Sequence, residues 1–231
     1  MLNSTLYVVA TPIGNIEDIT LRAIKILKQA DIIICEDIKP GRRILSKLDI
    51  VRDYNKLIPL NEHTEEENTK LIFDILLTKD VKAALISDAG TPLFADPGNA
   101  LIKKCNEYGL KVEPVPGASS LMATLMVSGI KLDKFLFYGF LPANKHQRIS
   151  ELKKLDRYKH LDLIFLEAPY RLKQLLRDFK SVLGKKREGI IFYKLTYPEQ
   201  KIIFGNLKEL SEKADNIAKG EFVFILKKKQ G

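Results

Sequence analysis

Three segments rich in Gly, Pro, Ser, Thr and Asp interrupt the first half of this chain and carry groups that could bind a polar ligand. They are TPIGN at 11–15, SDAGTPLFADPG at 87–98 and PGASS at 116–120. In the second segment, Gly90 lets the backbone approach a ligand closely, and the carboxylate of Asp88 could bind amines or hydroxyls. The alternative for such a composition is an elaborate turn that holds no ligand.

Common phosphate-binding and metal-binding patterns are absent from the sequence. No GxGxxG motif follows a strand and no GxxxxGKS/T motif occurs, which removes the main support for NAD or P-loop chemistry. Cys35 and Cys105 give no disulfide framework, and together with three scattered histidines they give no metal-ligand spacing. We therefore predict no metal site, and the three segments need another ligand.

Each of the three segments follows a predicted strand. The first half alternates apolar strands at 6–10, 30–35, 81–87 and 111–115 with helices that begin at Asp18 or Thr20, around 42, at 65, at 99 and after PGASS. This alternation predicts a parallel sheet built from right-handed crossovers. Because ligands bind at the carboxyl ends of such strands, we expect the three segments to gather along one edge.

The second half has a different pattern, which predicts a mixed or antiparallel sheet covered by a few helices. Strand-like segments rich in Phe, Ile and Tyr lie at 135–142, 161–167, 188–197, 200–207 and 221–227, with helices at 146–154, 171–179 and 207–214. We predict an α/β protein with two α/β domains, a mostly parallel one at 1–130 and a mixed one at 131–231, joined near 131–134.

Composition indicates a folded protein of a reducing compartment. Hydrophobic residues make up 45% and charged residues 29% of the 231, and the apolar runs are too short to cross a bilayer. The N-terminus lacks a signal-peptide pattern, so we expect a cytoplasmic protein with no membrane partner. The net charge of +9 fits a polyanionic partner or simple solubility, and residues 227–229 are expected to form a frayed tail.

The motifs TPIGNIEDITLRAIKIL, CED, SDAGTPLFADPG, VPGASS and YGFLPANKHQR together resemble those of a known family. The chain is similar, over about 6–220, to the tetrapyrrole (corrin/porphyrin) methylase superfamily, and most to its branch that methylates the ribose 2′-hydroxyl of a cytidine in small-subunit ribosomal RNA. The resemblance implies two α/β domains, S-adenosylmethionine bound in the cleft between them, and a homodimer.

The resemblance also implies which residues contact the cofactor. Pro12 would border the adenosine, the 88–90 segment with Leu93 would line the amino-acid and ribose portions, and two serines would lie near the methionine part. Two residues of the second domain would face the cofactor. The implied set is Pro12, Asp88, Ala89, Gly90, Leu93, Ser119, Ser120, Glu167 and Leu195.

Methyl transfer to a hydroxyl needs alignment and a proton acceptor, because a ribose hydroxyl is a poor nucleophile while protonated. Glu36 and Asp37, in CED after the second strand, are candidate bases, although one of them could instead cap the next helix. His63 is a candidate base or base-stacking group. Its alternative is a helix-start residue, since Thr64 and Glu67 would make a capping box.

Contacts with RNA are predicted in the second half. Arg171, at a strand-to-helix junction, could grip a phosphate or be a surface arginine. The basic segment 145–154 is a candidate for backbone contact, with a solvated helix face as its alternative. Tyr138 and Tyr170 could stack on an unpaired base or belong to the core.

Several positions on the acceptor side depart from the ribosomal-RNA branch, so the substrate is less well defined than the reaction. These departures are at 38–41, 169–171 and 193–197. We predict an S-adenosylmethionine-dependent methyltransferase acting on small-subunit ribosomal RNA, alone or in the subunit. The alternatives are a same-fold methyltransferase for another RNA site or a small molecule such as a tetrapyrrole, and a non-catalytic RNA-binding module.

Overall fold

The alternation of strands and helices in the first half produces a five-stranded sheet in which all four strand pairs are parallel. The computed structural model describes residues 4–50, 53, 56–94, 96–131 and 133–229. The sheet order is β3-β2-β4-β1-β5. The strands are β1 (Thr5–Val9), β2 (Ile32–Cys35), β3 (Leu57–Pro59), β4 (Lys82–Ile86) and β5 (Lys111–Val115). The strand β3 is not predicted by the sequence pattern, because a three-residue edge strand that ends in Pro carries almost no alternation.

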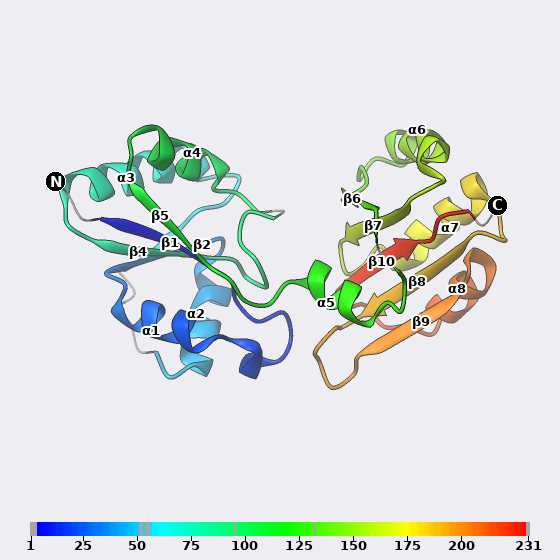
Figure 1. Ribbon diagram of the computed structural model, residues 1–231, viewed down its shortest axis with the longest axis horizontal. Coiled ribbons are helices and arrows are strands. Elements are labelled where there is room, and N and C mark those ends of the chain that lie inside the picture. Colours follow the sequence, from blue (N-terminus) through cyan, green and yellow to red (C-terminus); the bar gives the residue numbers. More distant parts are fainter. Residues whose placement is uncertain (1–3, 51–52, 54–55, 95, 132, 230–231) are drawn as a thin grey trace. The chain divides into compact units, whose positions relative to one another are not determined.

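Helices cover both faces of this sheet, as Figure 1 shows. Alternate residues of β2 point to opposite faces: Ile33 and Cys35 join the cluster with α1 and α2, and Ile34 joins the cluster with α3 and α4. A strand buried on both sides therefore reads as a continuous apolar run. The helical elements are η1 (Ile16–Asp18), α1 (Leu21–Gln29), α2 (Ile38–Lys47), α3 (Glu65–Thr78) and α4 (Asn99–Glu107).

Helix starts follow the predictions in one case and not in another. Thr20 caps α1, because its side chain accepts a hydrogen bond from the N–H of Ala23 at 3.1 Å. The capping box predicted for Thr64 and Glu67 is wrong, since Thr64 makes no side-chain cap hydrogen bond. Its hydroxyl instead accepts from the N–H of Asn61 and is thereby taken out of the capping position.

The second half folds into a mixed five-stranded sheet of order β6-β7-β10-β8-β9, in which only β6 and β7 are parallel. Both halves are thus α/β, as predicted. The strands are β6 (Phe135–Gly139), β7 (Asp162–Glu167), β8 (Glu188–Tyr193), β9 (Lys201–Asn206) and β10 (Phe222–Leu226). The helical elements are α5 (Ser120–Val127), α6 (Lys145–Lys154), η3 (Leu155–Tyr158), α7 (Leu172–Leu183) and α8 (Leu207–Ala214).

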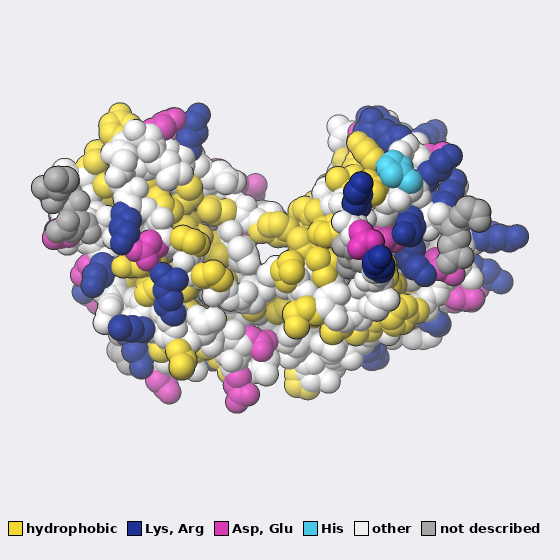
Figure 2. All heavy atoms as spheres, in the orientation of Figure 1, with side chains coloured by type: hydrophobic (Ala, Val, Ile, Leu, Met, Phe, Trp, Pro, Cys, Tyr) yellow, Lys and Arg dark blue, Asp and Glu magenta, His cyan; other side chains and the backbone are white. Residues whose placement is uncertain are grey.

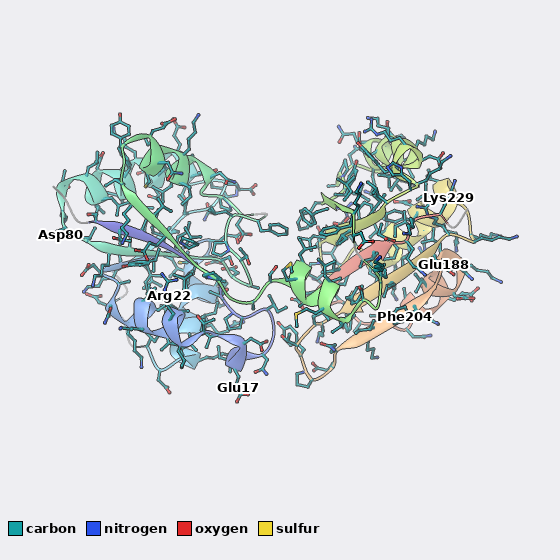
Figure 3. The ribbon with its side chains drawn as sticks, in the orientation of Figure 1. Glu17, Arg22, Asp80, Glu188, Phe204 and Lys229 are labelled. Atoms are coloured by element: carbon teal, nitrogen blue, oxygen red, sulfur yellow. The ribbon has the colours of Figure 1, made fainter. Side chains whose placement is uncertain are left out.

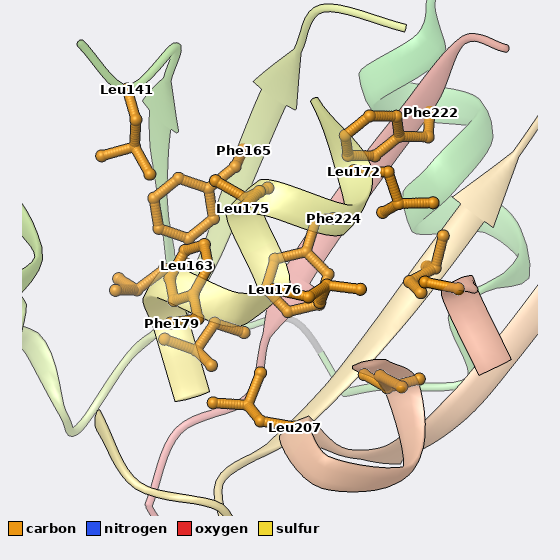
Figure 4. Close-up of a cluster of buried hydrophobic side chains, with 14 of the residues drawn as sticks. Leu141, Leu163, Phe165, Leu172, Leu175, Leu176, Phe179, Leu207, Phe222 and Phe224 are labelled. Carbon is orange, nitrogen blue, oxygen red and sulfur yellow. The ribbon is translucent and has the colours of Figure 1, made fainter. Parts of the chain in front are cut away.

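Aromatic rings of the second sheet form its core against α7 and α8 (Figure 4). Phe165 of β7 meets Phe179 of α7 edge to face with ring centroids 5.1 Å apart, and Phe179 lies 5.2 Å from Phe224 of β10. Such rings contribute large buried areas and prefer these tilted geometries. The Phe and Ile enrichment that marked the second half therefore builds one contiguous cluster.

The chain divides into two compact units, Met1–Ser119 and Ser120–Gly231. The division lies earlier than the join expected near 131–134, within which Leu132 lies outside the described residues. The physical reason is α5, which packs against β10 and so belongs to the second unit. Within the described parts of both units, no helix is long and apolar enough to span a bilayer.

The last lysines do not form a frayed tail, contrary to expectation. The carbonyl of Lys227 accepts from Nε of Arg187 at 2.8 Å, and the N–H of Lys228 donates to Oδ1 of Asp162 at 2.9 Å. The N–H of Lys229 donates to the carbonyl of Lys159 at 2.8 Å. Backbone hydrogen bonds at three consecutive residues therefore hold this segment on the second unit.

Candidate functional site

The segments after β1 and β4 are joined by a two-way backbone bridge at the carboxyl edge of the first sheet. The N–H of Thr11 donates to the carbonyl of Gly90 at 2.8 Å, and the N–H of Gly90 donates back to the carbonyl of Thr11 at 3.0 Å. The buried Thr11 hydroxyl donates to the carbonyl of Ser87 at 3.1 Å. Because β1 and β4 are neighbours in the sheet, the two loops leave it side by side.

The third segment, after β5, reaches the same place. The hydroxyl of Thr91 donates to the carbonyl of Ala118 at 3.3 Å, and β5 pairs with the other side of β1. The predicted gathering of TPIGN, SDAGTP and PGASS on one edge is therefore confirmed. We call these three loops the rim. Ser119 ends the rim within the first unit, and Ser120 begins α5 in the second.

Backbone conformation in the rim is one that few residue types adopt. Gly90 has φ +83°, and a Cβ added there would lie 3.1 Å from Cγ2 of Ile13. Leu93 has φ +67°, in the left-handed region that non-glycine residues rarely occupy, and Gly98 has φ +118°. Strain of this kind concentrates at functional sites, where the surrounding structure maintains it. Ala95, in the same loop, lies outside the described residues.

Asp88 presents an unsatisfied oxygen at the rim. Its Oδ1 is buried and has no hydrogen-bond partner among the described residues. Burial raises the pKa of Asp88, and repulsion from Asp37 adds to the shift, while a hydrogen bond from the Asp37 backbone opposes it. A buried acceptor without a partner is rare and marks a position where a ligand donor would be accommodated. Its neighbour Ala89 is exposed, and Pro12 is half-buried.

The two carboxylates that follow β2 have separate roles. Asp37 caps α2, because its Oδ1 accepts from the N–H of Lys39 at 3.0 Å, so the cap alternative is correct for this residue. Burial raises the pKa of Glu36, and repulsion from Asp96 and then Asp88 raises it further. A raised pKa brings a carboxylate nearer to the range in which it works as a base at neutral pH.

His63 is exposed to solvent in the turn before α3. Its side chain is 84% exposed, and its Nε2 lies 3.6 Å from Oε1 of Glu62. The backbone around it is ordered by Asn61, whose Oδ1 accepts from the N–H of His63 and whose Nδ2 donates to the carbonyl of Glu36 at 3.3 Å. Among the described residues no group of three or more His, Cys, Asp and Glu is placed to hold a metal ion.

In the second unit, Glu167 and Arg171 form a buried ion pair. Nη1 of Arg171 lies 2.9 Å from Oε1 of Glu167, and Arg171 is only 9% exposed, so the surface-arginine alternative is wrong. Burial raises the pKa of Glu167, while Arg171 works against that shift. The second oxygen of Glu167 has no hydrogen-bond partner among the described residues. This carboxylate, like Asp88, therefore keeps an unused acceptor at a position implied for the cofactor.

Leu195 lies in a constrained turn after β8. The flanking residues Lys194 and Thr196 have φ of +47° and +66°, and Leu195 itself is buried. The N–H of Thr196 donates to Oε1 of Gln200 at 2.8 Å, which closes the turn. Nothing in the residue types predicted this strain, because Lys and Thr are not residues that favour the left-handed region.

Two of the residues that were expected to contact RNA, Arg148 and Tyr138, instead make contacts inside the second unit. Arg148, counted in the basic segment 145–154, is 1% exposed and pairs through Nη2 with Asp178 at 2.8 Å, so it is no surface residue. The Tyr138 hydroxyl donates to Glu151 at 2.8 Å, and burial raises the pKa of Tyr138 to about 12. Tyr170, by contrast, is 69% exposed, with Nζ of Lys219 5.5 Å from its ring centroid.

The chain matches a family model described as Tetrapyrrole (Corrin/Porphyrin) Methylases over residues 5–211. It is 38% identical to a Ribosomal RNA small subunit methyltransferase I of Pasteurella multocida, covering 99% of this chain and 80% of that protein. It is also 38% identical to the protein of that name from Thermotoga maritima, covering 97% and 99% of the two chains. The match thus extends over both units.

Solved structures share the fold at low identity. A uroporphyrin III C-methyl transferase from Thermus thermophilus superposes with TM-score 0.65 at 18% identity, covering 96% of each chain. A diphthine synthase superposes with TM-score 0.75 at 15% identity, covering 99% of this chain and 91% of that one. With the family model matched over most of the sequence and relatives near 40% identity, the chain belongs to the tetrapyrrole (corrin/porphyrin) methylase family.

Proposed function

We propose that this chain is an S-adenosylmethionine-dependent methyltransferase that acts on small-subunit ribosomal RNA, at the ribose 2′-hydroxyl of a cytidine. The observation that carries the proposal is the rim, where three loops from separate strands meet and one of them holds Asp88, whose Oδ1 is buried without a hydrogen-bond partner among the described residues. The names of the relatives supply the substrate class, because several are small-subunit ribosomal RNA methyltransferases.

The residues of the rim fit the cofactor in two respects. Oδ1 of Asp88 can accept from an ammonium or hydroxyl group, which relieves its unsatisfied state. Gly90 has φ +83° and no Cβ, so its loop can take a left-handed turn close to Ile13 that keeps side-chain atoms away from the backbone. The residues that would hold the cofactor in the first unit are Pro12, Asp88, Ala89, Gly90, Leu93 and Ser119, and those in the second are Ser120, Glu167 and Leu195.

When bound, S-adenosylmethionine supplies a methyl group already activated by the sulfonium. The protein then has to orient the acceptor hydroxyl and remove its proton. Glu36 is the proposed base, because its raised pKa makes it a better proton acceptor near neutral pH than an ordinary glutamate. Asp37 keeps α2 in place through its cap, and His63 is exposed enough to contact RNA.

Arg171 is proposed to support the reaction indirectly. Its guanidinium is held by Glu167 and by the carbonyls of Leu141 and Pro142 at 3.4 and 3.0 Å. These contacts fix both the implied cofactor residue Glu167 and the loop after β6. A phosphate would have to compete with them, so positioning is the better role for Arg171 than a direct grip.

Charge distribution favours RNA over a small tetrapyrrole as the acceptor. Residues 120–231 contain 23 of the 38 Lys and Arg but only 12 of the 29 Asp and Glu. An excess of this size on one unit is the electrostatic signature of a nucleic-acid partner.

Cytoplasmic location follows from this substrate. We also propose a homodimer, with exposed Met122, Met126 and Val127 of α5 as the face for a second copy.

The test combines binding with transfer. Calorimetry should give a micromolar-range S-adenosylmethionine site, and the purified chain should transfer a tritiated methyl group to small subunits or their RNA, mapped by mass spectrometry to a ribose. Cofactor binding without transfer to ribosomal RNA would indicate another acceptor. A chain that binds no cofactor would be a non-catalytic module. Light scattering tests the homodimer separately.

A further inference from the structure

The positive charge of the protein comes from the second unit. Residues 120–231 carry 23 Lys and Arg against 12 Asp and Glu, whereas residues 1–119 carry 15 against 17. The net charge of +9 is therefore an excess in one unit that is partly offset by the other. In Figure 2 dark-blue side chains gather on the second unit around the described C-terminal end. Lys229 and Glu188, labelled in Figure 3, lie at that end.

Sheet topology explains why basic residues far apart in sequence meet there. β10 runs antiparallel to both β7 and β8, so its last residue, Leu226, pairs with Leu163 and Gly189 near the starts of those strands. Three segments consequently share one end of the sheet: 155–161 before β7, 184–187 before β8 and 227–229 after β10. The basic segment predicted from the sequence, 145–154, lies just before the first of these segments, and the last was expected to be a frayed tail.

Hydrogen bonds keep these segments together. Lys229 is held by the carbonyl of Lys159, and the carbonyl of Lys227 by Nε of Arg187, in each case at 2.8 Å. The result is a depression of about 460 Å³ lined mainly by cations. Its cationic lining residues are Lys185, Lys186, Arg187, Lys228 and Lys229. We call these five, together with Lys159 and Lys227 of the same hydrogen-bonded segments, the basic edge.

Carboxylates neutralise only part of the basic edge. Lys227 pairs with Glu188 at 2.6 Å, and Lys229 pairs with Asp156 at 2.8 Å. Asp162 is buried and accepts from the backbone of Lys228, and Glu209 lines an adjacent pocket with Lys186 and Lys227. The C-terminus of α7 adds about half a negative charge. Within the part of the chain that the structure describes, the ammonium groups of Lys185, Lys186 and Lys228 make no ion pair.

Arg187 makes the charge imbalance more pronounced. It is 9% exposed, and its Nε donates to the backbone carbonyl of Lys227. Among the described residues, no carboxylate forms an ion pair with Arg187. Burial lowers the pKa of Arg187, while Asp156 and Asp162 oppose the shift at longer range. A mostly buried cation without a paired anion is costly, and an external anion would relieve it.

We propose that the basic edge binds the phosphate backbone of the RNA substrate at a distance from the methyl-transfer site. The inference rests on the proposed function and extends it. Glu167 is the last residue of β7 and Leu195 follows β8, so both lie at the other end of these strands from the basic edge, and a six-residue strand is roughly 20 Å long. With a phosphate about every 3.4 Å along a strand, an RNA of only about three nucleotides bound for reaction would not reach the basic edge, whereas a folded ribosomal RNA domain would.

The test compares two triple variants with the same change of charge. K185Q/K186Q/K228Q removes the unpaired lysines of the basic edge, and K25Q/K28Q/K79Q removes exposed lysines of the first unit as the control. Binding to protein-free small-subunit RNA is measured against salt concentration, together with steady-state methylation of that RNA and calorimetry with S-adenosylmethionine. All measurements use the full chain.

For the first variant we expect KM for RNA to rise about tenfold with kcat and cofactor affinity unchanged. The slope of log K against log salt should fall by about 2, since each phosphate contact to single-stranded RNA contributes roughly 0.7. Methylation of a short oligonucleotide by the two variants should be equal. Equal RNA binding by both variants would overturn the inference. A loss of binding seen only with intact subunits would also overturn it, because it would indicate an acidic protein partner. A wild-type chain that binds cofactor but methylates no ribosomal RNA would instead refute the proposed function.

Discussion

Arg148 and Arg171 donate hydrogen bonds to the same carbonyl oxygen, that of Pro142, each at 3.0 Å. The first comes from α6 and the second from the start of α7, and both are almost fully buried. Their charges are balanced by Asp178 and Glu167, respectively. Two ion pairs thus hold the loop after β6 from two sides, next to a residue implied for the cofactor.

Removing one of these arginines should cost much more stability than removing an exposed one. Arg171→Ala leaves Glu167 as a buried, unpaired carboxylate, so the free energy of unfolding should fall by roughly 3 kcal/mol. Arg177→Ala, on the same helix but exposed and 3.8 Å from Asp215, should cost less than about 0.5 kcal/mol. Urea unfolding measures both, and equal midpoints for the two variants would contradict the role given to the ion pair.

Gly90→Val should abolish cofactor binding. The added side chain meets Ile13 and lies in a left-handed backbone conformation, so it displaces the rim and costs about 1–3 kcal/mol of stability. The control is Gly109→Val, because Gly109 has φ +67° but nothing within 4 Å of an added Cβ. It should show similar backbone strain with normal affinity by calorimetry. If affinity survives Gly90→Val, the site is elsewhere.

Asp88→Asn should weaken S-adenosylmethionine binding at least tenfold while the fold is kept, because the amide lacks the charge that attracts an ammonium group. Asp80→Asn, an exposed change in the same unit, serves as its control. Calorimetry gives the affinity, and circular dichroism verifies the fold. Unchanged affinity in the Asp88 variant would mean that its unsatisfied oxygen faces no ligand donor.

Glu36→Gln should reduce kcat by about 10²–10⁴ and leave cofactor affinity unchanged, because it removes a proton acceptor without changing shape. In the wild type, kcat should rise with pH through the raised pKa of Glu36 and then level off. The variant should lose that rise. A variant that keeps both the rate and the pH profile would exclude Glu36 as the base.

The same carboxylates should make stability depend on pH. Burial raises the pKa values of Glu36, Asp88 and Asp96 in the folded state. Their contribution is therefore fully present below the unfolded pKa near 4, and it is lost as pH rises through the folded pKa values. Glu36→Gln should accordingly raise the Tm at pH 7, because the free energy of unfolding increases by about 1 kcal/mol or less, and it should have little effect at pH 3. Scanning calorimetry at both pH values measures this difference.

Local pattern determined most of the secondary structure and the gathering of the rim. Alternating apolar runs and helix-length spacers require a parallel sheet, and a parallel sheet brings the ends of β1, β4 and β5 to one edge. The motifs in those loops were sufficient to recognise the family. Thr20 could be named, beside Asp18, as a candidate cap because a cap depends on residues only three positions apart, and the structure selects Thr20.

Only the tertiary structure decided how the charged residues are used. Arg148 has the same local pattern as its exposed neighbours, yet its partner Asp178 comes from another helix and buries it. Lys229 looks like a tail residue, yet β10 carries it to Lys159. Burial and pairing depend on contacts across long stretches of chain, and the spacing of residues within one segment carries no information about them.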